Sequence, residues 1–84
     1  MSSRFIEFSA VSVNAGQNVR VIYNVDRIIG IIQVKDEATG KLVTAVKMHG
    51  TVSAEMFADE NGELFHWLSY SLQSEEMTVN ENVP

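Results

Sequence analysis

An alternation of apolar and polar side chains with a period of two is the feature that most limits how this chain folds. It runs from Val19 to Asp26, and most of its apolar residues are β-branched. Successive side chains of a β-strand point to opposite faces of a sheet, so the run predicts a strand with one buried face. The predicted inward side chains are Val19, Val21, Tyr23 and Val25.

The segments on either side of this strand are also extended in character. Residues 5–13 change their apolar phase partway along, which predicts a β-bulge near Ser9 and Ala10. Residues 14–18 contain a glycine and two asparagines and predict the loop of a hairpin. Residues 28–34 are apolar on both faces, so we expect this strand to be covered on both sides.

A turn at residues 36–40, with Gly40 in the left-handed conformation, is expected to lead into a returning strand. Short connections of this kind join strands into an antiparallel meander. The sequence therefore predicts a mainly β fold, a small antiparallel meander or barrel-like sheet of about five to six strands. The inward side chains of the returning strand are expected to be Leu42, Thr44, Val46 and Met48.

The last part of the chain fits two structures. Residues 51–57 alternate and predict another strand, and Asn61–Gly62 is a strong hairpin signal, so residues 63–72 would form a final strand. However, residues 63–72 contain no β-branched residue, and their apolar side chains follow the spacing of an amphipathic helix. The alternative is therefore a C-terminal helix within residues 63–76. We prefer the strand because of the hairpin signal.

The length and composition predict one small globular domain. The chain has 84 residues, of which 45% are hydrophobic, and a single proline. We expect residues 1–74 to form a β-rich domain and residues 75–84 a flexible acidic tail. No window is apolar over the length of a membrane span, and no signal-peptide core follows the N-terminus, so we expect a soluble cytoplasmic protein with no membrane partner.

The charges are divided unevenly along the chain. Residues 1–50 hold all six basic residues and four acids, a balance of +2, whereas residues 51–84 hold seven acids and no lysine or arginine, a balance of −7. Phosphate backbones are bound by clustered cations, so we expect no nucleic-acid partner. A partner with a basic surface is the expected match for the acidic half, and the alternative is that the acids serve solubility alone.

No motif for catalysis or metal binding stands out. The chain has no cysteine, which excludes disulfides, thiolate metal sites and cysteine nucleophiles. His49 and His66 are the two histidines, and neither is paired with carboxylates at ligand spacing. We therefore expect a protein that is not an enzyme and that needs no metal and no cofactor.

An aromatic run and an acidic cluster are the candidate partner-binding residues. A single small sheet does not easily bury large side chains on both sides of residues 63–72, and tryptophan and tyrosine are enriched at the centres of interfaces. The alternative is that these side chains complete the core of the monomer. We expect a protein-interaction module that forms a homo-oligomer, or that docks as an inhibitor or regulator on a larger protein. Its expected anchors and acidic contacts are Phe65, Trp67, Tyr70, Asp59, Glu60 and Glu63.

A second hypothesis concerns the arginines. Arg20 and Arg27 lie seven residues apart, and together with Arg4 they would hold a phosphate if they converged between protomers. The alternative function is therefore an oligomeric protein that binds or sequesters a small anionic ligand such as a nucleotide. The competing role for Arg20 and Arg27 is an ion pair with Glu7 or Asp26.

The segment from Val19 to Ile32 resembles a pattern found in several short bacterial and phage β proteins. Among them are phage anti-defence proteins that sequester cyclic-nucleotide immune signals, so the resemblance is compatible with a phage-encoded or bacterial regulator. It covers fourteen of the 84 residues, and the Lys- and Glu-rich helix that often follows such a segment is absent here. No ligand and no site residue is carried over from it.

Overall fold

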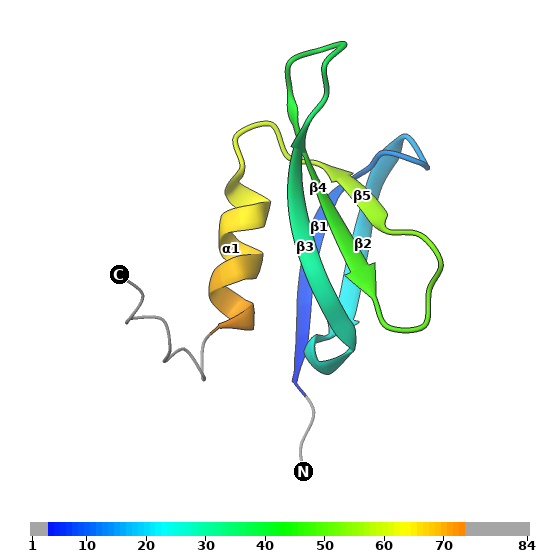
Figure 1. Ribbon diagram of the computed structural model, residues 1–84, viewed down its shortest axis with the longest axis vertical. Coiled ribbons are helices and arrows are strands. Elements are labelled where there is room, and N and C mark those ends of the chain that lie inside the picture. Colours follow the sequence, from blue (N-terminus) through cyan, green and yellow to red (C-terminus); the bar gives the residue numbers. More distant parts are fainter. Residues whose placement is uncertain (1–3, 74–84) are drawn as a thin grey trace.

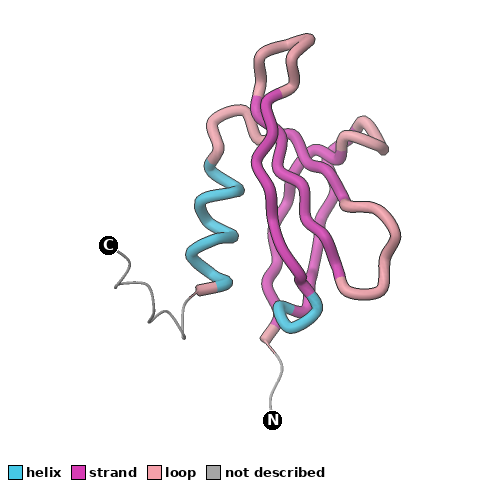
Figure 2. Tube along the Cα trace, viewed as in Figure 1, coloured by secondary structure: helices cyan, strands magenta, loops and turns pink. Residues whose placement is uncertain are grey.

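The computed structural model describes residues 4–73, and the predicted tail of residues 75–84 lies outside them. Five antiparallel strands form one open sheet in the order β2-β1-β5-β4-β3, and one helix packs on it (Figures 1 and 2). The prediction of a mainly β antiparallel fold is confirmed. The elements are β1 (Phe5–Ser12), β2 (Gln17–Asn24), the 3-10 turn η1 (Val25–Arg27), β3 (Ile28–Lys35), β4 (Leu42–Met48), β5 (Glu55–Ala58) and α1 (Glu63–Leu72).

Two hairpins build most of the sheet, and each has a glycine where the chain reverses. Gly16 has a φ of 69° in the β1–β2 turn, and Gly40 has a φ of 77° in the β3–β4 turn, a region that side chains with a Cβ rarely occupy. The Asp36 carboxylate also accepts a hydrogen bond from the backbone N–H of Ala38 and another from the Thr39 hydroxyl. The two predicted hairpin loops are confirmed.

The predicted bulge in β1 is wrong. The β1–β2 register runs without interruption from the pair Phe5↔Asn24 to the pair Ser12↔Gln17. The change of apolar phase arises because Val11 points to the exposed face of the sheet instead of the core. The irregularity of the sheet lies in β3, between Ile28 and Gly30.

Residues 63–72 form a helix, so the preferred prediction of a last strand is wrong. The fifth strand is confined to Glu55–Ala58, and Gly62 begins the helix with a φ of 75° instead of turning a hairpin. The apolar stripe of the helix buries Leu68 completely, which a strand of the same sequence would not do as effectively. The predicted end of the helix beyond Gln73 lies outside the described residues.

The core lies between α1 and one face of the sheet. Its fully buried side chains are Val46 of β4, Phe57 of β5 and Leu68 of α1. Thr44 is also buried, which confirms the inward face predicted for β4. The cover expected on both sides of β3 is found on one side: α1 lies on the core face, while Ile32 on the opposite face stays exposed.

Candidate binding site between the helix and the first strand

The pairing of β1 with β5 is short and leaves one side of β1 open. The two strands pair only at Val11↔Ala58 and Ser12↔Phe57, and the N–H of Val13 donates to the carbonyl of Met56 at 2.9 Å. After Ala58 the chain turns away toward α1. Residues 5–10 of β1 therefore have β2 on one side and no strand of the described chain on the other.

The open side of β1 presents backbone hydrogen-bonding groups. Antiparallel strands bond through alternate residues, and the bond from Val13 to β5 assigns the odd-numbered residues of β1 to this side. On the β2 side, the carbonyl of Arg4 accepts from the N–H of Val25 at 2.9 Å, which agrees with the even-numbered residues pointing to β2. The N–H and C=O of Ser9 and Glu7 thus point toward the open side.

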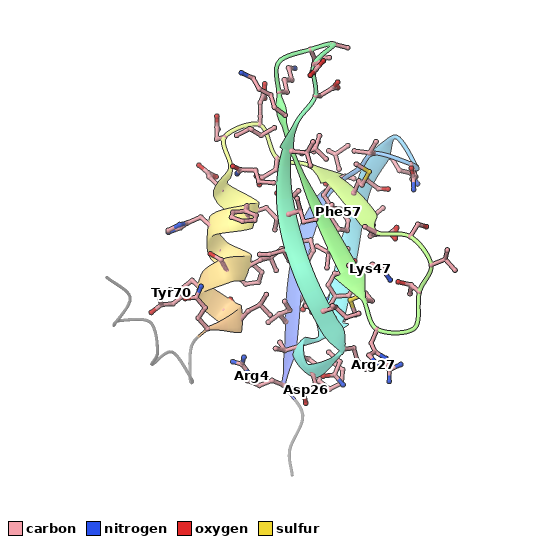
Figure 3. All side chains as sticks on the ribbon, viewed as in Figure 1. Arg4, Asp26, Arg27, Lys47, Phe57 and Tyr70 are labelled. Atoms are coloured by element: carbon pink, nitrogen blue, oxygen red, sulfur yellow. The ribbon has the colours of Figure 1, made fainter. Side chains whose placement is uncertain are left out.

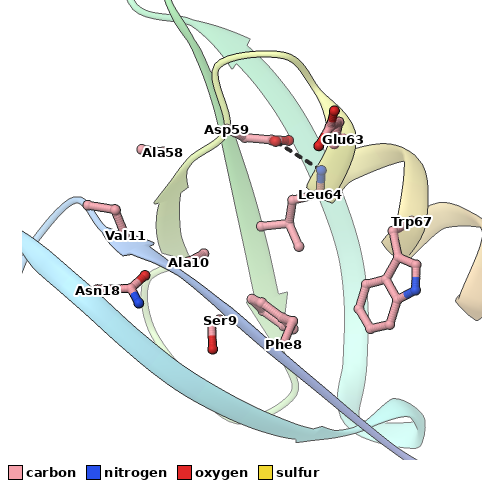
Figure 4. A pocket seen from close by; sticks show the side chains of 10 residues that line it. All are labelled: Phe8, Ser9, Ala10, Val11, Asn18, Ala58, Asp59, Glu63, Leu64 and Trp67. Atoms are coloured by element: carbon pink, nitrogen blue, oxygen red, sulfur yellow. Dashed lines mark hydrogen bonds between the residues drawn. The ribbon is translucent and has the colours of Figure 1, made fainter.

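A hollow of about 410 Å³ lies beside this open stretch of backbone (Figure 4). Trp67 of α1 forms part of its wall and stays 40% exposed. The Trp67 ring meets the Phe8 ring edge to face, with their centroids 6.0 Å apart. The lining is mostly apolar, with a few polar groups: Phe8, Ser9, Ala10, Val11, Asn18, Ala58, Asp59, Glu63, Leu64 and Trp67.

Asp59 is buried and holds the start of α1 in place. One carboxylate oxygen accepts from the N–H of Leu64 at 2.9 Å, and the other accepts from the N–H of Phe65 at 2.9 Å and from the Thr44 hydroxyl at 2.7 Å. These bonds satisfy two N–H groups that the first turn of a helix leaves unpaired. The carboxylate is fully occupied within the fold.

The three predicted acidic contacts therefore lie in different environments. Glu60 is exposed, and one of its carboxylate oxygens is 3.4 Å from the Nζ of Lys41. Glu63 is exposed in the first turn of α1 and lines the hollow. Asp59 faces inward, so of the three acids only Glu60 and Glu63 add to the exposed negative surface.

The three predicted aromatic anchors do not share one face. Residues of a helix are about 100° apart around its axis, which places Phe65 and Trp67 on opposite flanks of α1, about 200° apart. Phe65 is partly buried. Tyr70 is 72% exposed and points away from the sheet in Figure 3. Trp67 is the predicted anchor that the fold places at the hollow.

The three arginines of the second hypothesis are spread over the molecule. Arg20 forms an ion pair with the Glu7 carboxylate on the adjacent strand and lies opposite Ser9 in the register. Arg4 donates from Nη2 to the carbonyl of Ser71 at 3.0 Å, and it lies with Arg27 near the lower end of the molecule in Figure 3. The fold brings Arg4 and Arg27 to one end and leaves Arg20 on the middle of β2.

The two histidines lie on the surface, and the described residues place no cluster of metal ligands beside them. His49 is in the turn after β4, and His66 is exposed on α1. Among residues 4–73, no three histidine, aspartate or glutamate side chains converge in a way that would hold a metal ion. In the same part of the chain, no helix has the length and apolar character needed to cross a membrane.

Among the side chains of residues 4–73, Tyr23 is the one whose pKa the fold shifts most clearly. Burial, and secondarily the charge of Glu55, raise the pKa of Tyr23 from 10.0 to about 12. A group whose pKa is raised by folding stabilises the fold below its unfolded pKa, and this stabilisation disappears as the pH rises through the folded value. We expect the free energy of unfolding to fall between about pH 10 and pH 12 for this reason.

Urea denaturation measured across this pH range tests the expectation. Tyr23→Phe should remove most of this decline, whereas the control Tyr70→Phe, at an exposed position, should retain it. An identical decline in the unaltered chain and in Tyr23→Phe would show that other groups cause the loss of stability.

Several residues of the hollow were not identified from the sequence. Phe8, Ser9 and Leu64 follow ordinary core or strand patterns, so no local signal separates them from structural residues. Trp67 was found because an aromatic residue on a short amphipathic segment is a recognisable signal for an interface. No family model, no curated protein and no solved structure matches this chain, so the geometry of the site carries the functional argument.

Proposed function

We propose that this protein is a non-enzymatic interaction module that binds an extended segment of another protein along the open side of β1. The observation that carries the proposal is the half-exposed Trp67 ring at a hollow of about 410 Å³, directly beside strand backbone that no other strand of residues 4–73 pairs with on that side. An apolar side chain of the partner would fill the hollow between Phe8, Leu64 and Trp67.

Strand addition explains why both features occur together. When a peptide adds to the side of a sheet, main-chain hydrogen bonds supply affinity and pockets for its side chains supply specificity. Here the N–H and C=O of Ser9 supply the main-chain bonds, and the hollow receives the side chain. The slot has defined ends, because the pair Val11↔Ala58 closes one end and the bond from Arg4 to Ser71 bridges the other.

The charge around the slot selects the class of partner. Glu63 is on the wall of the hollow, Glu60 lies nearby in sequence, and the whole chain has a net charge of −5. Opposite charge accelerates encounter and suppresses partners of the same sign. We therefore propose a partner segment in which lysine or arginine flanks the apolar residue that enters the hollow.

Selection of peptides from a random display library against the full-length chain tests this function. We expect enriched peptides to carry an apolar residue with adjacent basic residues, and Trp67→Ala to weaken their binding by about 2 kcal/mol, chiefly through a faster off-rate. The measurement is the dissociation kinetics of a selected peptide by surface plasmon resonance.

Tyr70→Ala is the matched control, because Tyr70 is an aromatic residue on the same helix that points away from the sheet. It should bind the selected peptide as the unaltered chain does. Enrichment of acidic peptides, or binding that Tyr70→Ala abolishes and Trp67→Ala does not, would place the interaction elsewhere and contradict the proposal.

A further inference from the structure

We infer that β3 pairs with β3 of a second copy of this chain, antiparallel and centred on Ile32, so that the two sheets join into one. This interface lies at the opposite end of the sheet from the β1–β2 hairpin and does not depend on the proposed function. Three features of β3 support this pairing: its open edge, the direction of its backbone groups, and the charges at its ends.

The outer edge of β3 has few of the features that usually protect an edge strand: its bulge, between Ile28 and Gly30, lies at one end, and its one charged residue, Lys35, lies at the other. Natural edge strands are shortened, covered, or carry charges and proline that prevent pairing. Here β3 is eight residues long, and from Ile28 to Val34 it contains no charged residue and no proline. In Figure 1, β3 lies in front of β4 and no other element crosses it. Its side chains Ile29, Ile32 and Val34 are exposed.

The hydrogen bonds to β4 show which backbone groups of β3 face outward. The N–H of Asp36 donates to the carbonyl of Lys41 at 2.8 Å, so this pair bonds across the hairpin. Because bonding alternates along an antiparallel ladder, Val34 and Ile32 also point their backbone groups to β4. Ile31, Gln33 and Lys35 therefore point theirs to the free edge.

This alternation restricts how two β3 strands can meet. The hydrogen bonds across the new junction must join residues of both copies whose backbone groups point to the free edge. When Ile32 lies on the two-fold axis, Ile31 of one copy bonds with Gln33 of the other. In such a junction the two sheets form one continuous sheet with their core faces on the same side, so both α1 helices lie on that side. Gly30 then lies opposite Val34 of the other copy.

The charges beyond the strand ends favour this register. With Ile32 at the centre, the end of β3 that follows Arg27 in one copy meets the end that precedes Asp36 and Glu37 in the other, and the symmetry repeats this approach at the second end. Moving the centre by one residue, to Ile31, brings Arg27 nearer to Lys35 of the other copy, and like charges that face each other on paired strands are destabilising. Charge complementarity thus argues for a second copy as the occupant of this edge.

The mass in solution, measured by sedimentation equilibrium on the full chain, tests the inference. We expect twice the monomer mass of 9.4 kDa, and a return to 9.4 kDa for Ile32→Lys, which places two like charges at the axis. Ile22→Lys is the matched control: Ile22 lies on the other edge strand and is 60% exposed, against 59% for Ile32. This control should remain a dimer.

Two further variants test the hydrogen bonds and the register. Gln33→Pro removes an outward N–H and leaves the bonds to β4, so it should also yield a monomer with an unchanged far-UV circular dichroism spectrum. Arg27→Glu should weaken the dimer, and Arg27→Glu combined with Glu37→Arg should restore most of its affinity.

A mass of 9.4 kDa at the highest soluble concentration would overturn the inference. So would a dimer that survives Ile32→Lys and Gln33→Pro, or one that Ile22→Lys dissociates, since either result moves the interface away from the β3 edge. Failure of the charge exchange to restore affinity would overturn the register centred on Ile32. None of these outcomes affects peptide binding beside Trp67, so the two proposals fail separately.

Discussion

Replacing Phe57 by alanine is expected to lower the free energy of unfolding by about 3–5 kcal/mol. The side chain is 1% exposed, and its ring meets the Phe8 ring edge to face with centroids 5.4 Å apart. In the register it lies between Ser12 of β1 and Thr44 of β4. The short strand β5 is the connection between the two hairpins of the sheet, so a cavity at Phe57 weakens both halves at their junction.

A loss of this size is a large part of the stability of a small domain, which is typically about 5–15 kcal/mol. Urea denaturation followed by circular dichroism measures it as a lower midpoint with an unchanged slope. Phe5→Ala is the matched control, because Phe5 is 62% exposed and its removal should change stability by less than about 0.5 kcal/mol. Equal losses for the two variants would show that Phe57 is not at the centre of the core.

Asp59→Ala is expected to destabilise the chain by about 2–4 kcal/mol, although most aspartates tolerate this change. Loss of the helix cap costs about 0.5–2 kcal/mol, and leaving the fully buried Thr44 hydroxyl unpaired costs about 1–3 kcal/mol. The midpoint of thermal unfolding of Asp59→Ala should be lower than that of the unaltered chain. The start of α1 moves with it, so the hollow beside Trp67 should also change shape.

Glu60→Ala is the control for this prediction, because Glu60 is the adjacent acid and forms only an exposed ion pair with Lys41. We expect it to change stability by no more than about 1 kcal/mol. A second control combines Asp59→Ala with Thr44→Val: without a hydroxyl to leave unpaired, the further loss caused by Asp59→Ala should be smaller. A full loss in the Thr44→Val background would contradict the role assigned to the Thr44 bond.

The proposed peptide site and the proposed self-pairing use opposite parts of the same sheet. One lies where β5 ends and leaves one side of β1 without a neighbouring strand of the described chain, and the other lies at the outer edge of β3. Both arise from unpaired strand backbone next to exposed apolar side chains. A dimer formed through β3 would present two copies of the Trp67 site, so a partner with two binding segments would gain affinity from their linkage.

The strands of the two hairpins were predictable from local sequence. The alternation in β2, the inward residues of β4 and the loops containing Gly16 and Gly40 each depend on neighbours in the chain. Side-chain direction along a strand and the tolerance of glycine for positive φ are local properties, which is why sequence reasoning identified them. The mainly β antiparallel fold followed from the same signals.

Residues 63–72 were not decided locally, because their pattern satisfies a strand after Asn61–Gly62 and also an amphipathic helix. Two tertiary contacts favour the helix. Leu68 packs in the core beside Val46 and Phe57, and the Asp59 carboxylate caps the first turn of the helix. Both contacts join segments that are separate in sequence, and burial of this kind outweighs the modest differences in local propensity.

The sequence by itself determined where the strands and turns of the two hairpins occur and that Trp67 is a candidate contact residue. Only the tertiary structure decided which strand ends where, and therefore that β1 is open beside Trp67, that β3 is an edge and that Asp59 is buried. The physical reason is that strand neighbours and burial depend on pairing between distant segments, which the local periodicity of a chain does not specify.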